Sequence, residues 1–370
     1  MTKDSPWLRR QLRNMGAADE YDVPGEGVLS LAKRLGLELK DIVKLDANEN
    51  FIFPAELTAS ELCQLSRFLD TRLYPLDQKT RLTAALTEYL NVSPDQIVVG
   101  NSSDDVLEIV ARVFLKRKAS AVSITPTFVM YRVITSNLGR KFIEVPLKED
   151  FSLDVEDILT ACEKSTHICF LCSPNNPTGN QFPTEQVETL AERFDGLLVI
   201  DEAYVEYAPY STVNLIHKYR NLMVLRTFSK AFGLAGLRIG YAVASAEIAS
   251  ALRRMQLPYN VNTVSLEMAL RVLKRLDLVE AAIERVKVER ARLMSAMKRI
   301  PGVSPYASDS NFILFKTMRE ARQVRDDLAE RAILIRYYDS PGLERYLRVT
   351  VGTAEMNDRF LDALREVVDV

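Results

Sequence analysis

The side chains best suited to chemistry lie in residues 226–241, around Lys230. This lysine follows an expected strand and a short Thr-Phe-Ser bridge, in an apolar loop punctuated by glycines. An amine in such surroundings loses hydration, which lowers its pKa and allows it to act as a nucleophile and a base. Ser229 is adjacent and Arg238 follows, so a hydroxyl group and a cation are available to hold a phosphate.

A second candidate is Asp201, which closes the apolar run 197–201. In open α/β folds, ligands bind at the carboxyl ends of the strands, where this carboxylate is expected to lie. A buried carboxylate requires a cationic partner, and a protonated pyridine nitrogen is a suitable one. The alternative is an ordinary strand-end aspartate that caps a turn.

Two further segments follow expected strands. Residues 173–179 (SPNNPTG) contain two prolines and a glycine that form a rigid turn, and such a turn can hold an asparagine amide still, although ordinary loops are also rich in these residues. Residues 99–105 open an expected helix, whose free backbone N–H groups can bind a phosphate. A plain Ser/Asp helix cap is the alternative for this second segment.

Composition excludes several classes of function. The 370 residues include 48 Lys plus Arg and 50 Asp plus Glu, a net charge of -2 that gives no reason to expect nucleic acid as a partner. With two histidines, a His-based triad or multi-histidine metal site is nearly excluded, and we expect no metal. Cys169 and Cys172 lie within an apolar run and are predicted to be core residues rather than redox or zinc-binding ones. No apolar run is long enough for a membrane span or signal peptide, so we expect a cytoplasmic protein without a membrane partner.

The elements that position these residues alternate between strands and helices, which predicts an α/β fold with a mostly parallel sheet between helices and a smaller α+β domain after it. We expect an N-terminal arm and part of the small domain in 1–45, a large domain in 46–270 and a C-terminal small domain in 271–370. The expected strands are 97–99, 121–124, 142–145, 167–172, 197–201, 222–226, 239–244, 312–315, 332–336 and 346–351. The expected helices are 28–35, 104–116, 127–138, 184–193, 276–297, 318–330 and 354–367.

Six strings spread over most of the chain resemble the pyridoxal-5′-phosphate (PLP)-dependent aminotransferases of fold type I. They are 44–50 (KLDANEN), 100–104 (GNSSD), 173–179 (SPNNPTG), 201–204 (DEAY), 228–238 (FSKAFGLAGLR) and 347–352 (LRVTVG). Within that superfamily they are most similar to the histidinol-phosphate aminotransferases. The resemblance implies an aspartate-aminotransferase-like fold with a seven-stranded sheet, PLP as cofactor and a ping-pong transamination.

The resemblance also implies a role for each matching residue. Lys230 would hold PLP as a Schiff base and move the substrate proton, and Asp201 would pair with the pyridine nitrogen. Asn176 and Tyr204 would contact the phenolic oxygen, and Phe128 would stack on the ring. The phosphate would be bound by Ser103, Asp104, Ser229, Arg238 and, from the neighbouring subunit of a homodimer with a shared active site, Tyr74.

Substrate binding is implied for Arg348, at the α-carboxylate, and for Arg336, Asn50 and the N-terminal Tyr21. Residues 51–53 (FIF) replace the usual Pro-Tyr-Gly and make the substrate-side wall more apolar. An aromatic or broad-specificity aminotransferase and a PLP-dependent amino-acid-phosphate decarboxylase therefore stay open as alternatives. A non-catalytic PLP-binding regulator is a third, but the chain has no spare segment for a DNA-binding domain.

Overall fold

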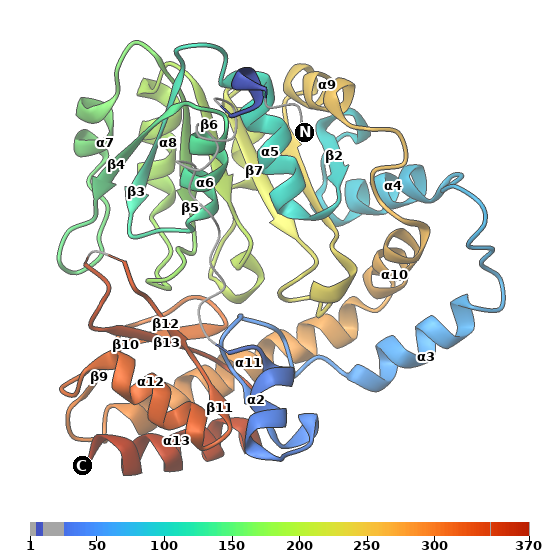
Figure 1. The fold of residues 1–370 in the computed structure, drawn as a ribbon. Helices are drawn as coiled ribbons and strands as arrows, with labels where there is room; N and C mark the ends of the chain where they lie inside the picture. The colour runs from blue at the N-terminus through green and yellow to red at the C-terminus, as the bar shows by residue number, and fades with distance from the viewer. Residues whose placement is uncertain (1–4, 10–25, 341, 370) are drawn as a thin grey trace.

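The computed structural model describes residues 5–9, 26–340 and 342–369. The described strands form two main β-sheets, of seven and four strands, and a separate two-stranded pair (Figure 1). The larger sheet lies in the middle of the chain, and the smaller one is formed by its last third. Tyr21 lies outside the described residues.

The larger sheet has seven strands in the order β2-β8-β7-β6-β5-β3-β4. All neighbours are parallel except β8, which runs antiparallel to both β2 and β7. The mostly parallel sheet predicted from the alternation of elements is therefore confirmed. Its strands are β2 (Ile97–Gly100), β3 (Ser120–Thr125), β4 (Lys141–Pro146), β5 (Thr166–Cys172), β6 (Leu197–Asp201), β7 (Leu222–Thr227) and β8 (Gly240–Ala244).

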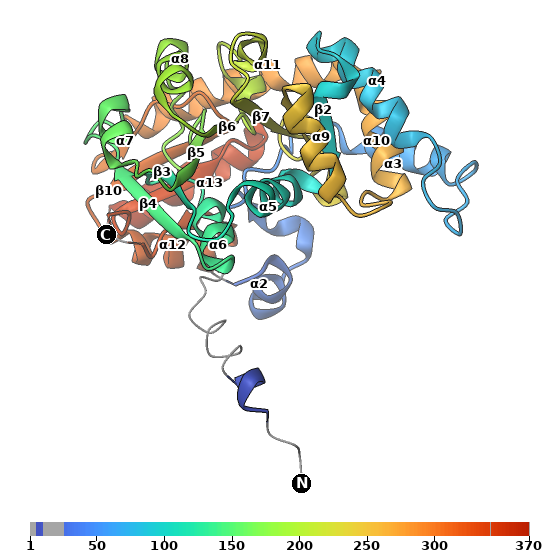
Figure 2. The same cartoon turned by 90° about the horizontal axis from the view of Figure 1, so that it is seen from above.

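Helices cover both faces of this sheet (Figures 1 and 2). Side chains alternate along each strand, so that Ile168 and Phe170 of β5 join one apolar core while Cys169 and Leu171 join the other. On the first face lie α5 (Ser102–Phe114), α6 (Met130–Asn137) and α9 (Ala246–Met255). On the second lie α4 (Gln78–Leu90), α7 (Val155–Ala161), α8 (Thr184–Arg193) and α10 (Thr263–Leu273).

The smaller sheet has four antiparallel strands in the order β12-β13-β10-β9. The single strand expected over 332–336 is wrong. The chain leaves the two-stranded pair at Leu334, which pairs with Lys44. It enters the four-stranded sheet at Arg336, which pairs with Arg348. The four strands of the smaller sheet are β9 (Val303–Pro305), β10 (Phe312–Thr317), β12 (Arg336–Tyr337) and β13 (Tyr346–Thr350). The separate two-stranded pair consists of β1 (Val43–Lys44) and β11 (Ile333–Leu334), which run parallel.

Of the remaining helices, most α-helices pack around the smaller sheet or connect it to the larger one, and several short helices lie against the larger sheet and its covering helices. Most helix bounds agree with the predicted ones, but α6 begins later than expected. The side chain of Thr127 donates a hydrogen bond to Asn175, so this stretch joins the 173–179 turn instead of the helix. These helices are α2 (Val28–Leu35), α3 (Ala55–Leu65), α11 (Leu276–Met297), α12 (Ala321–Glu330) and α13 (Ala354–Val368), with short 3-10 helices at Leu39–Asp41, Pro94–Gln96, Val205–Tyr207, Val213–His217 and Ala235–Leu237.

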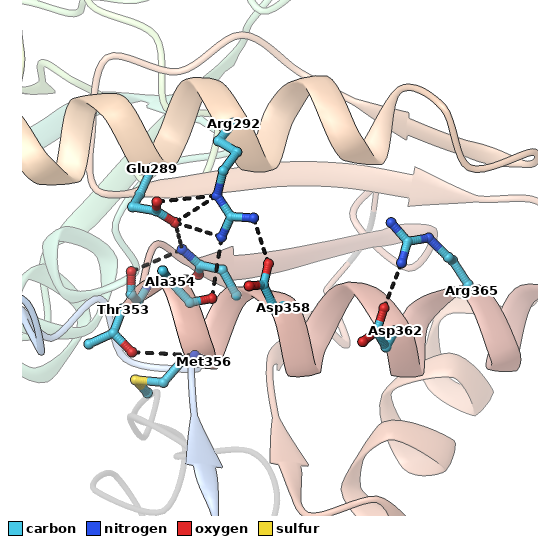
Figure 3. A network of polar contacts seen from close by, with 10 residues as sticks. Glu289, Arg292, Thr353, Ala354, Met356, Asp358, Asp362 and Arg365 are labelled. Atoms are coloured by element: carbon cyan, nitrogen blue, oxygen red, sulfur yellow. Dashed lines mark hydrogen bonds and ion pairs between the residues drawn. The ribbon is translucent and has the colours of Figure 1, made fainter.

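A polar network joins α11 to α13 (Figure 3). Arg292 bonds Glu289 one turn earlier, at 2.8 Å, and reaches Asp358 of α13 at 2.5 Å. Asn357, which is fully buried, donates to the same Glu289 carboxylate at 2.8 Å. Since α11 is the longest helix among the described residues, this network ties the C-terminal helix to a rigid support.

Residues 43–48 run beside both sheets. Leu45 accepts a backbone hydrogen bond from Thr350 of β13 and donates one to Leu334 of β11. The carbonyl of Ala47 accepts a hydrogen bond from Lys230, which follows β7 of the larger sheet. This segment therefore connects the two halves of the fold next to the predicted chemistry. Among the described helices, none combines the length and apolarity that crossing a membrane requires.

Candidate active site

Asp201 ends β6 at the carboxyl edge of the larger sheet, beside Cys172 at the end of β5. Its carboxylate is almost completely buried, and its hydrogen-bond donors are the backbone N–H of Ala203, at 3.1 Å, and the hydroxyl group of Tyr131, at 2.7 Å. Burial raises the pKa of Asp201 to about 6. Within the described residues this carboxylate has no ion-pair partner, so it can accept a cation brought by a ligand.

Lys230 follows β7, three residues after the strand ends at Thr227. Its amine donates to the carbonyl of Ala47 at 3.0 Å and lies 5.5 Å from the centre of the Tyr204 ring. Burial and, next in size, the positive charge of Arg348 lower the pKa of this amine to about 8. The desolvated amine expected from the apolar loop is therefore present.

Electrostatic interactions place the other charged candidates around the same amine. Asp104, Arg238 and Arg348 all lie near enough to Lys230 to influence its pKa. The charge of Asp104 also raises the pKa of Asp201, so this one carboxylate influences both Lys230 and the carboxylate at the end of β6. Segments far apart in the sequence thus converge at one edge of the sheet.

The start of α5 forms the candidate phosphate cradle. Gly240 of β8 allows the helix to approach the sheet closely, since a Cβ atom there would lie 2.4 Å from the backbone nitrogen of Ser103. Arg238 bonds the carboxylate of Asp104 at 2.8 Å, and the half-exposed arginine faces solvent on its other side. Ser229, which directly precedes Lys230, is buried. A helix N-terminus and a guanidinium group therefore lie together, and their role with Ser229 in phosphate binding stays a prediction.

Arg348 reaches this edge from β13 of the smaller sheet. Its guanidinium group donates to the side-chain oxygen of Asn176, at 2.7 Å, and to the carbonyl of Asp46, at 2.6 Å. The Nε atom is buried and has no hydrogen-bond partner among the described residues. A buried cation held on neutral oxygens, without a carboxylate, is suited to an anionic ligand.

Two asparagines support the residues on either side of Lys230. Asn48 donates to the Tyr204 hydroxyl group at 3.0 Å and is itself fully buried. Asn50 donates to the carbonyl of Ala231 at 2.9 Å, directly after the lysine. Its side-chain oxygen accepts from the backbone of residues 52 and 53. Asn50 was predicted to bind substrate. In this structure its side chain holds the loop that carries Lys230, through the carbonyl of Ala231.

Two other predicted residues lie apart from this cluster or at its margin. Arg336 is half-buried and pairs with Arg348 across β12 and β13. The centre of the Tyr338 ring lies 5.7 Å from the guanidinium carbon of Arg336 and 5.9 Å from that of Arg348. Tyr74 is exposed, in the connection between α3 and α4, and stacks on Tyr259 with the ring centres 4.4 Å apart. Figure 1 shows this connection at the far edge of the molecule.

Two of the three residues in 51–53 pack inside the protein. Ile52 and Phe53 are buried, and Phe53 packs on Gly233, where a Cβ atom would lie 2.8 Å from its ring. Phe51 lines a hollow together with Lys44 and with Met356 of α13. Phe53 therefore supports the loop that carries Lys230, and the apolar substrate-side wall stays a prediction.

Sequence reasoning missed a buried ion pair behind the site. Arg226 bonds Glu202 at 2.9 Å, and both side chains are almost completely enclosed. Because Glu202 follows Asp201 and Arg226 precedes Lys230, the pair connects the two strand ends that carry the predicted chemistry. A second missed residue is Tyr131, which contacts Asp201 from α6, and no local pattern in the sequence indicated this contact.

Comparisons with known proteins agree with this geometry. Residues 40–364 match the family model described as aminotransferase class I and II. The chain is 40% identical over 358 residues to the histidinol-phosphate aminotransferase of Roseiflexus castenholzii, covering 95% of this chain and 96% of the relative. The crystal structure of histidinol-phosphate aminotransferase from Sinorhizobium meliloti, in complex with PLP, superposes with a TM-score of 0.86 at 26% identity, over 100% and 98% of the chains. A decarboxylase from Sulfurospirillum multivorans has a TM-score of 0.81 at 25% identity, over 98% and 97%.

Proposed function

Because the chain belongs to the class I and II aminotransferase family, we propose that it is a PLP-dependent histidinol-phosphate aminotransferase with 2-oxoglutarate as its amino acceptor. The observation that carries the cofactor assignment is a desolvated lysine amine in the same site as a buried carboxylate that has no ion-pair partner among the described residues. The substrate assignment rests on relatives at 36–40% identity that cover most of the chain, among them those of Roseiflexus and Caldanaerobacter.

The residues present fit PLP at each end of the cofactor. Asp201 supplies the negative charge for a protonated pyridine nitrogen, and Lys230 supplies the amine for the aldehyde. When bound, PLP withdraws electrons from the substrate Cα and stabilises the negative charge that develops there. The other cofactor contacts proposed are Phe128 on the ring face, Asn176 and Tyr204 at the phenolic oxygen, and Ser103, Asp104, Ser229 and Arg238 at the phosphate.

Lys230 is the proposed acid and base. Its ordinary pKa of 10.5 is lowered to about 8, so a substantial fraction of the amine is neutral at pH 7 to 8. The neutral Nζ atom takes the proton from the substrate Cα, and the protonated form can return one. Arg348 favours the neutral form because its positive charge disfavours a second cation nearby.

Two arginines are proposed to bind the anionic substrates. Arg348 would take the α-carboxylate of glutamate, for which a buried guanidinium group held on neutral oxygens is suited. Arg336, directly across the strand pair, would bind the phosphate of histidinol phosphate or the second carboxylate of glutamate. Tyr21 and Asn50 are proposed at the same substrates, Asn50 chiefly through the loop that it holds.

A homodimer with a shared active site is part of the proposal. The connection between α3 and α4 and that between α9 and α10 expose large apolar side chains, Phe68, Tyr74 and Leu76 on the first and Leu257 and Tyr259 on the second. An exposed apolar patch of this kind is typical of an interface. It would carry Tyr74 to the phosphate of the neighbouring subunit. We further propose the domain division 1–45, 46–270 and 271–370, which the two sheets support, and a cytoplasmic location.

The test is amino transfer measured with purified enzyme and PLP. With 2-oxoglutarate as acceptor, histidinol phosphate should be a better donor by kcat/KM than phenylalanine, and no carbon dioxide should be released. Preference for phenylalanine would favour the aromatic aminotransferase, and acceptor-independent release of carbon dioxide would favour the decarboxylase. Lys230→Ala should abolish turnover, whereas the control Lys164→Ala, in the connection before β5, should retain it.

A further inference from the structure

Tyr131, in the first turn of α6, touches the carboxylate at the centre of the proposed cofactor site. The side chain has no exposed surface, and its hydroxyl group donates to Asp201 at 2.7 Å. Its ring lies flat on Phe170 of β5, with centres 5.0 Å apart and planes 4° from parallel. The same ring meets Phe128 edge to face, with centres 5.6 Å apart. One buried side chain thus contacts both groups proposed to hold the pyridine ring.

The hydrogen bonds of Asp201 leave room for a further donor. The oxygen Oδ1 accepts from the backbone of Ala203, and Oδ2 accepts from Tyr131. A carboxylate offers about four lone-pair positions, so two donors orient it without occupying it fully. A ring nitrogen that carries a proton can therefore bind an already oriented acceptor.

The groups around Asp201 act in opposite directions on its ionisation. Burial raises its pKa, and the negative charges of Asp104 on α5 and of Glu202 raise it as well. The thiol of Cys172, at the end of β5, donates to the carbonyl of Pro174 and, because burial raises its own pKa, brings no charge at neutral pH. The Tyr131 hydroxyl group and the Ala203 N–H lower the pKa of Asp201. Of these, Tyr131 is the side chain that favours the ionised form.

We propose, on the basis of the PLP-dependent function above, that Tyr131 is a positioning residue, whose hydroxyl group keeps Asp201 ionised and aimed at the pyridine nitrogen while its ring sets the orientation of Phe128. The hydroxyl group acts before any cofactor is bound, because the hydrogen bond is a contact between two protein side chains. Its effect can therefore be measured on the cofactor-free protein.

The decisive variant is Tyr131→Phe, which keeps the ring against Phe170 and Phe128 and removes only the hydroxyl group. Tyr207→Phe is the matched control, since Tyr207 is also fully buried but its hydroxyl oxygen has no hydrogen-bond partner among the described residues. The first readout is the pKa of Asp201 in the cofactor-free protein, followed by NMR of ¹³C-labelled aspartate carboxyls and assigned by the signal missing in Asp201→Asn. The second readout is the Kd for PLP, measured by the quenching of protein fluorescence.

Tyr131→Phe should raise the pKa of Asp201 and weaken PLP binding about tenfold or more, the typical effect of losing a hydrogen bond to an ionised group. Tyr207→Phe should change neither value. An unchanged pKa and an unchanged Kd in Tyr131→Phe would overturn the inference. If the wild type itself did not bind PLP, the proposed function would fail, while the pKa measurement would still decide whether Tyr131 controls Asp201.

A second substitution covers the case in which the phenylalanine variant does not fold. Site-specific replacement of Tyr131 by 3-fluorotyrosine retains the ring and the hydroxyl group and makes the hydroxyl group a stronger donor. It should lower the pKa of Asp201 and leave PLP binding at least as tight as in the wild type. A pKa that rises or stays the same would contradict the proposed hydrogen bond.

Discussion

Replacing Asp201 with asparagine should stabilise the cofactor-free protein and weaken its binding of PLP. The pKa of this carboxyl rises from its ordinary value of 3.8 to about 6, chiefly through burial. At 1.36 kcal/mol for each tenfold change in proton affinity, the buried charge costs about 3 kcal/mol at neutral pH. Asparagine offers one hydrogen-bond acceptor fewer than the carboxylate, which costs about 1 kcal/mol. The free energy of unfolding is therefore expected to rise by about 2 kcal/mol.

The pH dependence of this effect has a definite sign. Because the pKa of Asp201 is raised in the folded state, its protonated form stabilises the folded protein. This stabilisation is complete below pH 3.8 and is lost as the pH rises through about 6 and the buried carboxyl group ionises. At pH 5 the cost of the charge is about half of its value at pH 8. The advantage of Asp201→Asn should therefore shrink from about 2 kcal/mol at pH 8 to less than about 1 kcal/mol at pH 5.

Urea denaturation of the cofactor-free proteins at both pH values measures this difference, and a fluorescence titration measures the Kd for PLP. The control is Asp195→Asn, which makes the same change at an exposed position and should leave both quantities unchanged. PLP binding by Asp201→Asn should weaken at least about tenfold, since the charged partner of the pyridine nitrogen is lost. A variant less stable than the wild type at pH 8, or one that binds PLP equally well, would refute the reasoning.

Three further substitutions test the support of the site. Glu202→Gln removes the nearer of the two carboxylates paired with the buried Arg226, leaving Glu206 at 3.8 Å, and should cost about 3 kcal/mol in the free energy of unfolding, measured with urea; a change under about 1 kcal/mol would show that the Glu202 pair is dispensable. Gly240→Ala should displace the start of α5 from β8, because its Cβ atom would lie 2.4 Å from the Ser103 nitrogen, and should weaken phosphate binding by the cofactor-free protein in isothermal calorimetry; normal binding would contradict the close approach. Arg348→Gln should raise the KM for glutamate about a hundredfold, the effect of losing a bidentate charged contact, and an unchanged KM would exclude it as the carboxylate contact. In the cofactor-free protein the same substitution should raise the pKa of Lys230, because a cation that lowers this pKa is removed.

The elements of the fold were predictable where the local pattern is strong. The helices Thr184–Arg193 and Leu276–Met297 and the strand Leu197–Asp201 agree with the predicted bounds to the residue. Each has a long amphipathic period or a continuous apolar run that needs no tertiary information. The stretch 332–336 was misassigned because its division between two sheets depends on β1 and β13, which lie far away in the sequence.

The candidate site was predictable for a related reason. Asp201, Lys230 and the start of α5 all follow strands of one mostly parallel sheet, so their convergence at its carboxyl edge follows from the topology. The bond of Tyr131 to Asp201 and the pairing of Glu202 with Arg226 depend instead on how side chains from different elements pack. No local pattern in the sequence encodes those contacts.

The central claim is that Lys230 holds the cofactor covalently, and borohydride trapping tests it most directly. The PLP-loaded enzyme would be reduced with sodium borohydride, digested and examined by peptide mass spectrometry. The reduced pyridoxyl group should be found on the peptide that contains Lys230, and its incorporation should abolish activity. A label on another lysine, or full activity after complete reduction with no label on Lys230, would contradict the account.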